Sequence, residues 1–373
     1  MLHASAIDPT PAVLPLPSIR VVAAPGDADR RTGNVHDHRS REVLLTRIAG
    51  LLDVGIGEPV EDATLHVPGD AIEVAVAKDL GIRRRDQILG GVVPAAFVAT
   101  KAITHGLLHP DARCPPLWST ALAGLMGDAA LTGYTAFSRA DALAAGRMLL
   151  ANGPVRIKDV CAKAGLGQVV VHDDAALADA LSREDDADLA HCGIVLEENL
   201  TEVVTYSVGT IQLPARTISY WGSQNLTRDH QGREVYGGSD LYVVRGGLDT
   251  LAAEPLSPAI ARAVACAGAF DRAAQLAYPD LLLTRRNYDV IEGIDAAGAR
   301  RIGVLEQSWR VGGASGAEIA AFEALRDEPD THAVRCSTVE IYAEIDPPTG
   351  ATVYFRGVDP RVGPMTKYAV RLA

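Results

Sequence analysis

The order of strand and helix patterns constrains the fold of this chain most. Up to about residue 95, short apolar runs typical of buried strands alternate with amphipathic helical patterns, as in an α/β domain. Helical patterns are expected at 69–81 and 95–108. After residue 200, strand patterns resembling antiparallel neighbours dominate, interrupted by helical patterns at 257–277 and 313–327. The fold class is therefore expected to be α/β (α+β).

These patterns divide the 373 residues into four parts. Four prolines between positions 9 and 17 predict a flexible lead-in over 1–17, and an N-terminal α/β domain is expected over 18–95. A core over 96–330 contains a small subdomain at about 134–197. A β-rich C-terminal extension covers 331–373.

Charge and apolar content narrow the range of partners. Asp and Glu outnumber Lys and Arg by 47 to 35, and a net charge of -12 disfavours a nucleic-acid partner. No stretch reaches the ~20 uninterrupted apolar residues that span a bilayer, and the N-terminus lacks the pattern of a signal peptide. The 5 cysteines form no CxxC pair, which is typical of a reducing compartment. A cytoplasmic protein with no membrane partner is expected.

Residues 155–171, VRIKDVCAKAGLGQVVV, combine lysine and glycine in a way that suits an anion. Lys158 ends a strand pattern, and Lys163, Gly165 and Gly167 lie in the loop before the chain returns as a second strand. Glycines let backbone N–H groups approach a phosphate, and a flanking lysine adds positive charge. The segment has neither the P-loop nor the GxGxxG pattern, so an ordinary tight turn is the alternative.

Acidic residues occur at the ends of two strand patterns. Glu197 and Glu198 end an apolar strand, as in a hinge whose backbone faces an adenine; solvated surface acids are the alternative.

Asp289 and Glu306 lie on consecutive strand patterns that pair if they are antiparallel neighbours. Two such adjacent carboxylates would either raise the pKa of one of them or need a cation, and oxygen ligands suit Mg²⁺. Arg310 follows, where it would stabilise a developing phosphate charge; surface hairpin acids are the alternative.

The order of these motifs resembles the ATP-grasp superfamily. The segments YSVGTIQL and GVLEQSWRVGGASGAE also resemble a bacterial ATP-grasp-like family of uncharacterised proteins. The resemblance covers roughly residues 95–328. It implies an ATP-grasp fold, in which two α/β subdomains hold ATP between antiparallel sheets, with ATP and Mg²⁺ as cofactors.

The resemblance also implies roles for individual residues. Those implied to bind ATP are Lys101, Lys158, Lys163, Gly165, Gly167, Glu197, Glu198 and Glu202. Those implied to bind the metal are Asp289, Glu306 and Ser308, and those implied to act in catalysis are Arg310 and Lys158. One position departs from the family pattern, because Ser308 stands where an Asn usually follows the metal-binding Glu by two residues (EQS for ExN).

The activity implied by the resemblance is ATP-dependent, ADP-forming ligation of a small carboxylate to an amine-type nucleophile through an acylphosphate. Two alternatives stay open: an ATP-grasp-type small-molecule kinase, and a nucleotide-binding module without turnover. A homodimer is compatible with this family. Arg245, in the polar segment 221–247, is a candidate anion clamp for a second substrate, with a plain surface meander as the alternative. Lys158→Ala is expected to leave the fold intact, because a lysine at a loop edge is normally exposed.

Overall fold

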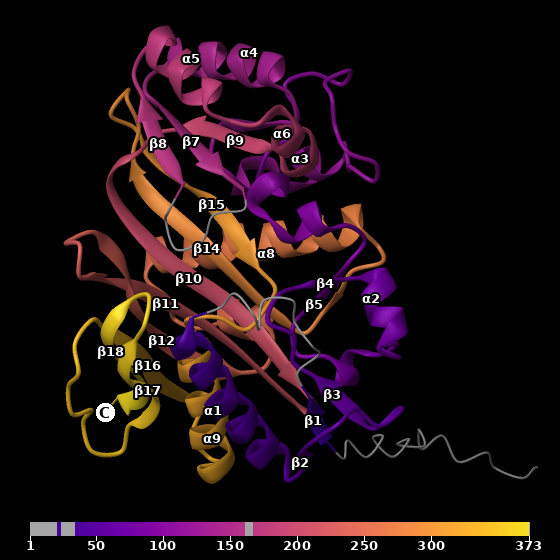
Figure 1. Ribbon diagram of the computed structural model, residues 1–373, viewed down its shortest axis with the longest axis vertical. Coiled ribbons are helices and arrows are strands. Elements are labelled where there is room, and N and C mark those ends of the chain that lie inside the picture. The colour runs from indigo at the N-terminus through magenta and orange to yellow at the C-terminus, as the bar shows by residue number, and fades with distance from the viewer. Residues whose placement is uncertain (1–20, 24–33, 161–166, 373) are drawn as a thin grey trace, which may run out of the picture.

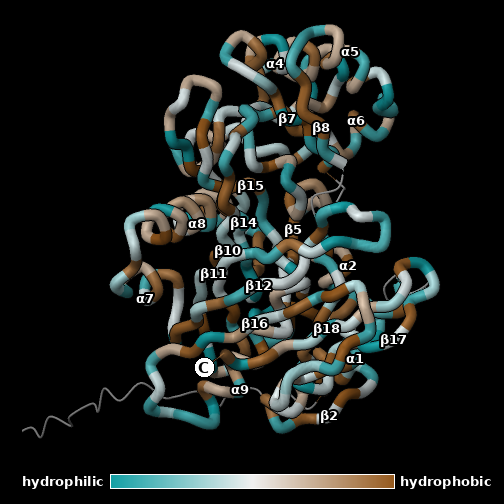
Figure 2. Tube along the Cα trace, turned by 90° about the vertical axis from the view of Figure 1, so that its left-hand side faces the viewer, coloured by the Kyte–Doolittle hydropathy of each residue, from teal (hydrophilic) through white to brown (hydrophobic). Residues whose placement is uncertain are grey.

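The computed structural model describes residues 21–23, 34–160 and 167–372. Within these residues the strands form four sheets; the small sheet within residues 133–198 lies at the top of the molecule, and the other three lie below it (Figure 1). Hydrophobic residues concentrate in the strands and in the inner faces of the helices, while the loop tips are mostly hydrophilic (Figure 2). Among the described residues, no helix combines the length and apolar character required to cross a membrane.

The N-terminal part contains a parallel sheet ordered β2-β1-β3. Its elements are β1 (Val21–Ala23), α1 (Val35–Leu52), β2 (Gly55–Ile56) and β3 (Thr64–His66). The chain continues through β4 (Ile72–Glu73), α2 (Val74–Asp79), the 3-10 turn η2 (Arg85–Gln87) and β5 (Gly91–Val93). β5 pairs with β4 and also with β13 (Leu282–Leu283), so this part is joined by a strand ladder to the rest of the chain.

Two helix predictions in this region are wrong in extent. The segment expected as a helix over 69–81 begins as β4, because residues 72 and 73 pair with β5, and the helix α2 that follows is short. The segment over 95–108 forms two 3-10 turns, η3 (Ala96–Ala99) and η4 (Lys101–Thr104). Thr100 separates the turns because its backbone is extended and its side chain accepts a hydrogen bond from the Ala102 N–H.

A small antiparallel sheet ordered β6-β9-β7-β8 lies at one end of the molecule (Figure 1). It follows α3 (Leu122–Met126) and η5 (Gly127–Ala129). Its strands and helices are β6 (Gly133–Ala136), α4 (Arg139–Leu150), β7 (Val155–Asp159), β8 (Gln168–Val171), α5 (Asp174–Ser182), α6 (Asp186–Cys192) and β9 (Ile194–Glu198). Ser138 and Asp173 cap α4 and α5 by accepting backbone N–H bonds. The helix α6, which has its own cap at Asp185, is absent from the predicted elements.

The central sheet has eight strands in the order β15-β14-β10-β11-β12-β16-β18-β17. Its elements are β10 (Thr201–Leu213), β11 (Arg216–Arg228), β12 (Glu234–Arg245), α7 (Leu248–Ala252), α8 (Pro258–Ala277), β14 (Arg285–Ile294), β15 (Arg300–Ser308), α9 (Ser315–Asp327), β16 (Ala333–Ile341), β17 (Thr352–Asp359) and β18 (Gly363–Leu372). In the C-terminal extension, β16 pairs with β12, and β18 pairs with β16. The extension therefore enlarges the central sheet instead of forming a separate one.

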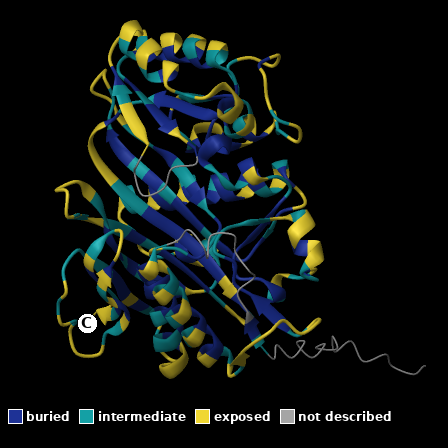
Figure 3. Ribbon diagram, in the orientation of Figure 1, coloured by how far each residue is buried: buried dark blue, intermediate teal, exposed yellow. Residues whose placement is uncertain are grey.

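Alternation along the central strands separates a packing face from a polar face. Val208, Tyr288 and Val290 are buried in the cluster that contains α8. Because successive side chains of a strand point to opposite faces, Ser207 and Asp289 face away from α8. Figure 3 shows that these strands are largely buried along their middle. The polar face of β10, β14 and β15 therefore carries the acids that the sequence analysis selected.

Candidate functional site

Asp289 and Glu306 face each other across two neighbouring antiparallel strands. The register of β14 and β15 makes them direct partners, next to a bulge that begins at Val290. The Asp289 Oδ1 atom accepts hydrogen bonds from Asn287 Nδ2 at 3.0 Å and from Ser207 Oγ at 3.3 Å. Burial and then the negative charge of Glu306 raise the pKa of Asp289 to about 6. The pair therefore favours a cation between its carboxylates.

Lys101 lies against this pair. Its Nζ is 3.1 Å from Glu306 Oε2, and its side chain is only 5% exposed. Lys101 begins the turn η4, which is held on β15 because Gln307 Nε2 donates to the Thr100 carbonyl at 2.7 Å. A buried ammonium next to two carboxylates suits the binding of a polyphosphate together with a divalent cation.

A second charged cluster lies in the small sheet. Lys158, from β7, forms an ion pair with Glu197 of β9, and His105 Nε2 is 3.0 Å from the other Glu197 oxygen. Glu197 is 1% exposed. Burial raises the pKa of Glu197, but the positive charge of Lys158 and the hydrogen bond with His105 outweigh it and lower the pKa to about 2.

This cluster corrects one expectation about Lys158. The residue was expected to be exposed at a loop edge, but only 3% of it is accessible. Its charge is neutralised by a carboxylate that is itself buried. The expected exposure of Lys158 is therefore wrong, and we now expect Lys158→Ala to destabilise the fold, because that change leaves Glu197 buried without its ion-pair partner.

The turn η4 connects the two clusters. Lys101 at its start contacts Glu306 of the central sheet, and His105 directly after it contacts Glu197 of the small sheet. The turn is fixed to the small sheet by Thr135, whose hydroxyl donates to the Ala102 carbonyl at 2.6 Å. His105 was absent from the predicted site. Its position four residues after Lys101 was the only signal in the sequence.

The predicted phosphate loop is described only at its ends. Lys163 and Gly165 lie outside the described residues. Gly167 has φ +66°, in the left-handed region that favours glycine. Its carbonyl accepts the Asp159 N–H at 2.9 Å, which extends the β7–β8 hairpin by one further bond. The hairpin thus brings both ends of the loop next to Lys158.

Glu198 and Glu202 occupy different surroundings from Glu197. The Glu198 carboxylate accepts the Thr132 N–H at 2.8 Å and pairs with Arg301 at 3.1 Å, which ties the small sheet to β15. Glu202 is exposed, with φ 51°, at an irregularity of the β10–β14 ladder. Their roles toward adenine and ribose stay predictions.

Ser308 and Arg310 follow Glu306 on the same segment. Arg285 donates to the Ser308 carbonyl at 3.0 Å and to its hydroxyl at 3.3 Å. Arg310 donates to the Val311 carbonyl at 3.1 Å and is half-buried, and its predicted role toward phosphate stays a prediction.

A Mg²⁺ ion fits the donor chemistry of Asp289 and Glu306. Both are carboxylates on one face of the sheet, and burial, followed by the negative charge of Glu306, raises the pKa of Asp289, so a cation between the two would favour their ionised forms. Within the described residues, however, no three His, Cys, Asp or Glu side chains gather at a metal-binding spacing. A third protein ligand would have to be of another kind.

Arg245 has a structural task instead of clamping an anion. Its guanidinium donates to the backbone carbonyls of Glu328 at 3.0 Å and Pro329 at 3.3 Å, and also to that of Leu325. These carbonyls lie at the end of α9, where helix carbonyls lack intrahelical partners. Arg245 therefore caps α9.

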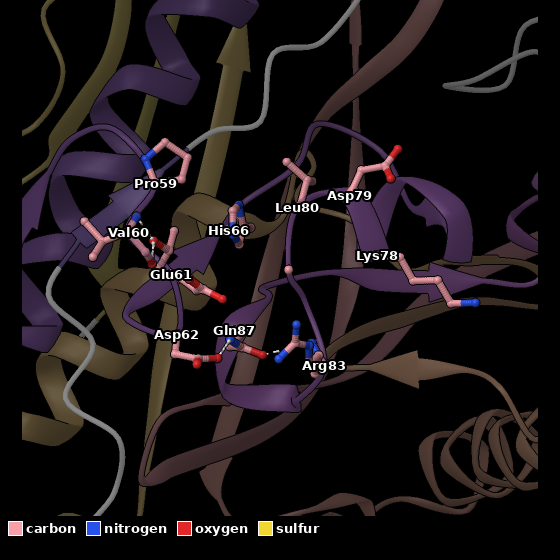
Figure 4. Close-up of a pocket in the computed structure, with 12 residues that line it drawn as sticks. Pro59, Val60, Glu61, Asp62, His66, Lys78, Asp79, Leu80, Arg83 and Gln87 are labelled. Carbon is pink, nitrogen blue, oxygen red and sulfur yellow. Dashed lines mark hydrogen bonds between the residues drawn. The ribbon is translucent and has the colours of Figure 1, made fainter.

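A cleft of about 370 Å³ lies in the N-terminal part, away from these residues in the sequence (Figure 4). Glu61 and Asp62 lie on one side, Lys78 and Arg83 on the other, and the buried His66 is at its back. The cleft contains none of the predicted site residues.

A family model described as "Protein of unknown function (DUF3182)" matches residues 24–369. No curated protein matches the chain significantly. Among solved structures, the biotin carboxylase domain dimer of the Hydrogenobacter thermophilus 2-oxoglutarate carboxylase, in complex with MgADP, ADP and bicarbonate, is similar with a TM-score of 0.53 and 11% identity. That match covers 95% of this chain and 86% of the other.

The biotin carboxylase from Campylobacter jejuni, solved as a β-γ-ATP complex, is similar with a TM-score of 0.51 and 11% identity. The match covers 95% of this chain and 88% of that one. Both are ATP-grasp enzymes, so the ATP-grasp fold expected from the sequence is confirmed over nearly the whole chain. At this level of identity the likeness concerns the fold alone.

Proposed function

Since this chain belongs to the DUF3182 family and has the ATP-grasp fold, we propose that it is an ATP-dependent, ADP-forming ligase that joins a small carboxylate to an amine-type nucleophile. The observation that carries the proposal is that one segment contacts both charged clusters: Lys101 of η4 contacts Glu306, the partner of Asp289, and His105 after η4 contacts Glu197, the partner of Lys158. A divalent cation needs carboxylates and a polyphosphate needs lysines, and both kinds of group must lie close together to bind the two at one site.

Each charged cluster has a distinct task in this proposal. Asp289 and Glu306 hold Mg²⁺, which neutralises the β- and γ-phosphates when bound. Lys101, whose ammonium lies 3.1 Å from Glu306 Oε2, would supply positive charge for the phosphates. Lys158 contributes a positive charge that Glu197 and His105 hold in a fixed position.

The reaction is the transfer of the γ-phosphoryl group followed by its displacement. The substrate carboxylate oxygen bonds to the γ-phosphorus while the bond to the β–γ bridging oxygen breaks, which releases ADP. The amine then attacks the acyl carbon, phosphate leaves and the amine loses a proton. Arg310 stabilises the negative charge that develops on the phosphoryl group during transfer.

The proposal is tested by screening small carboxylates and amines for Mg²⁺-dependent ADP release. The expected result is ADP formation that rises when both substrates are present and is lost in Glu306→Gln. The matched control is Glu234→Gln, an exposed acid at the start of β12, which should keep full activity. ADP release that needs no amine and yields a phosphorylated product would indicate a kinase instead.

A nucleotide-binding module without turnover is the second candidate. It is favoured by Ser308, because a hydroxyl stands where the family pattern has an amide and Arg285 donates to that hydroxyl. This candidate predicts tight binding of MgATP with no ADP formation under any substrate combination. A cytoplasmic location and a homodimer stay predictions.

A further inference from the structure

Asn287 lies beside the carboxylate pair proposed to bind the cation. It is the direct partner of Ser308 in the β14–β15 ladder, two residues along from the Asp289 and Glu306 pair. Because side chains of a strand alternate between faces, Asn287 lies on the same face as Asp289. Asn287 is 7% exposed, and its amide is within 3.0 Å of Asp289 Oδ1.

Ser308 is poorly suited to bind a cation. Its hydroxyl accepts a hydrogen bond from Arg285, which is 2% exposed and always carries a positive charge. The remaining nitrogens of Arg285 donate to the buried carboxylate of Glu318 at 2.7 and 3.3 Å, which fixes the guanidinium in place. A divalent cation on the Ser308 hydroxyl would meet this fixed charge at close range.

The hydrogen bonds around Asn287 leave its amide with two possible orientations. Tyr220 Oη is 2.8 Å from Asn287 Oδ1 and 2.8 Å from Glu318 Oε1. A tyrosine hydroxyl carries one proton, and the ionised Glu318 can only accept it. If the Tyr220 proton goes to Glu318, its oxygen is best matched by the amide nitrogen of Asn287. An amide rotated by 180° satisfies this contact, because its N and O atoms exchange places.

The rotated amide directs its oxygen toward Asp289. Two facing oxygens repel unless a cation lies between them. In an octahedral Mg²⁺ site with ligand distances of 2.0–2.1 Å, adjacent oxygens are roughly 2.9 Å apart. The observed separation between the amide of Asn287 and Asp289 Oδ1 is 3.0 Å. The spacing therefore already suits two neighbouring ligands of one ion.

We propose that Asn287, and not Ser308, is the third protein ligand of the divalent cation, which it binds through its amide oxygen together with Asp289 and Glu306. This inference rests on the proposed function, because it requires a cation at that pair. The family pattern has an amide two residues after the metal-binding Glu, where β15 has Ser308. Asn287, the partner of Ser308 on β14, would supply that amide instead.

The test is the affinity for Mn²⁺, measured from the electron paramagnetic resonance signal of the free ion in the presence of adenylyl imidodiphosphate. Asn287→Ala is expected to weaken Mn²⁺ binding at least tenfold, whereas Ser308→Ala should change it less than about threefold. Asn287→Asp keeps an oxygen ligand and should retain binding. Tyr220→Phe removes the hydroxyl that orients the Asn287 amide but removes no ligand, so it should weaken Mn²⁺ binding clearly less than Asn287→Ala does.

The outcomes separate this inference from the proposed function. If Ser308→Ala loses Mn²⁺ while Asn287→Ala keeps it, the ligand assignment is overturned and the proposed function stands. If Tyr220→Phe weakens Mn²⁺ as much as Asn287→Ala, the effect comes from the hydrogen bonds and the assignment is likewise overturned. If the wild-type protein binds nucleotide but no Mn²⁺, both the cation site and this inference fail. Melting curves of every variant establish that the folded protein is measured.

Discussion

Glu197→Gln removes the charge at the centre of the buried cluster in the small sheet. The change leaves the Lys158 ammonium buried without a counter-ion, and breaking a buried pair in this way costs about 3–5 kcal/mol. The pKa of Glu197 gives a similar magnitude. Lowering it from 4.5 to about 2 corresponds to roughly 3 kcal/mol of stabilisation at neutral pH. We expect the free energy of unfolding at pH 7 to fall by about this amount.

The assay is urea unfolding followed by circular dichroism, with Glu198→Gln as the matched control. Glu198 is the next residue of the same strand but lies at the surface side of the sheet, so its loss should cost about 1 kcal/mol. A loss below 1 kcal/mol in Glu197→Gln, or equal losses in the two variants, would refute the view that the buried cluster stabilises the small sheet.

The same carboxylate predicts a pH dependence. Because the pKa of Glu197 is lower in the folded state than in the unfolded chain, its stabilisation is fully present above about pH 4.5 and is lost as pH falls toward 2. Wild-type stability should therefore drop more steeply than that of Glu197→Gln in this window. Parallel curves for the two proteins would show that Glu197 titrates normally.

Three further predictions concern Lys158, a glycine and the ligand. Lys158→Ala should lower the free energy of unfolding by about 3–5 kcal/mol, whereas Lys78→Ala, on the exposed end of α2, should be nearly silent in the same urea titration. Gly209→Ala should cost about 1–3 kcal/mol, because its Cβ would lie 2.7 Å from the Arg286 carbonyl and press on Tyr220; Gly124→Ala, with open space around it, should cost nothing. MgATP at a hundredfold over its Kd should stabilise the protein by about 2.7 kcal/mol in thermal unfolding, and the absence of any shift at millimolar MgATP would argue against the nucleotide site.

Much of the fold was predictable because long segments have clear periodicity. The helix α8 and the strands β14 and β15 follow patterns of eight or more residues, and the pairing of Asp289 with Glu306 follows from strand order. The short elements were predicted less well. The extended Thr100 divides a helical pattern into η3 and η4, and a single residue of this kind leaves almost no periodic signal.

The sequence singled out the acids and lysines of the candidate site, and strand order predicted the Asp289–Glu306 pair but not the contact between Lys158 and Glu197. The sequence marks Lys158 and Glu197 separately, and only the antiparallel arrangement of β7 and β9 brings them together. His105 and Asn287 carry no motif, because their roles depend on contacts between segments far apart in the chain. The main error concerned the burial of Lys158, which was expected to be exposed. A lysine next to a glycine loop gives no sign in the sequence that a neighbouring strand covers it.

The most direct test of the nucleotide site is calorimetric titration of the protein with ADP, with and without Mg²⁺. The arrangement of Lys101, Lys158 and the Asp289–Glu306 pair predicts saturable binding to one site that Mg²⁺ strengthens in the wild type. In Glu306→Gln, ADP should still bind, but Mg²⁺ should add little. Absence of ADP binding at millimolar concentration, or an equal Mg²⁺ effect in wild type and Glu306→Gln, would contradict the proposed site.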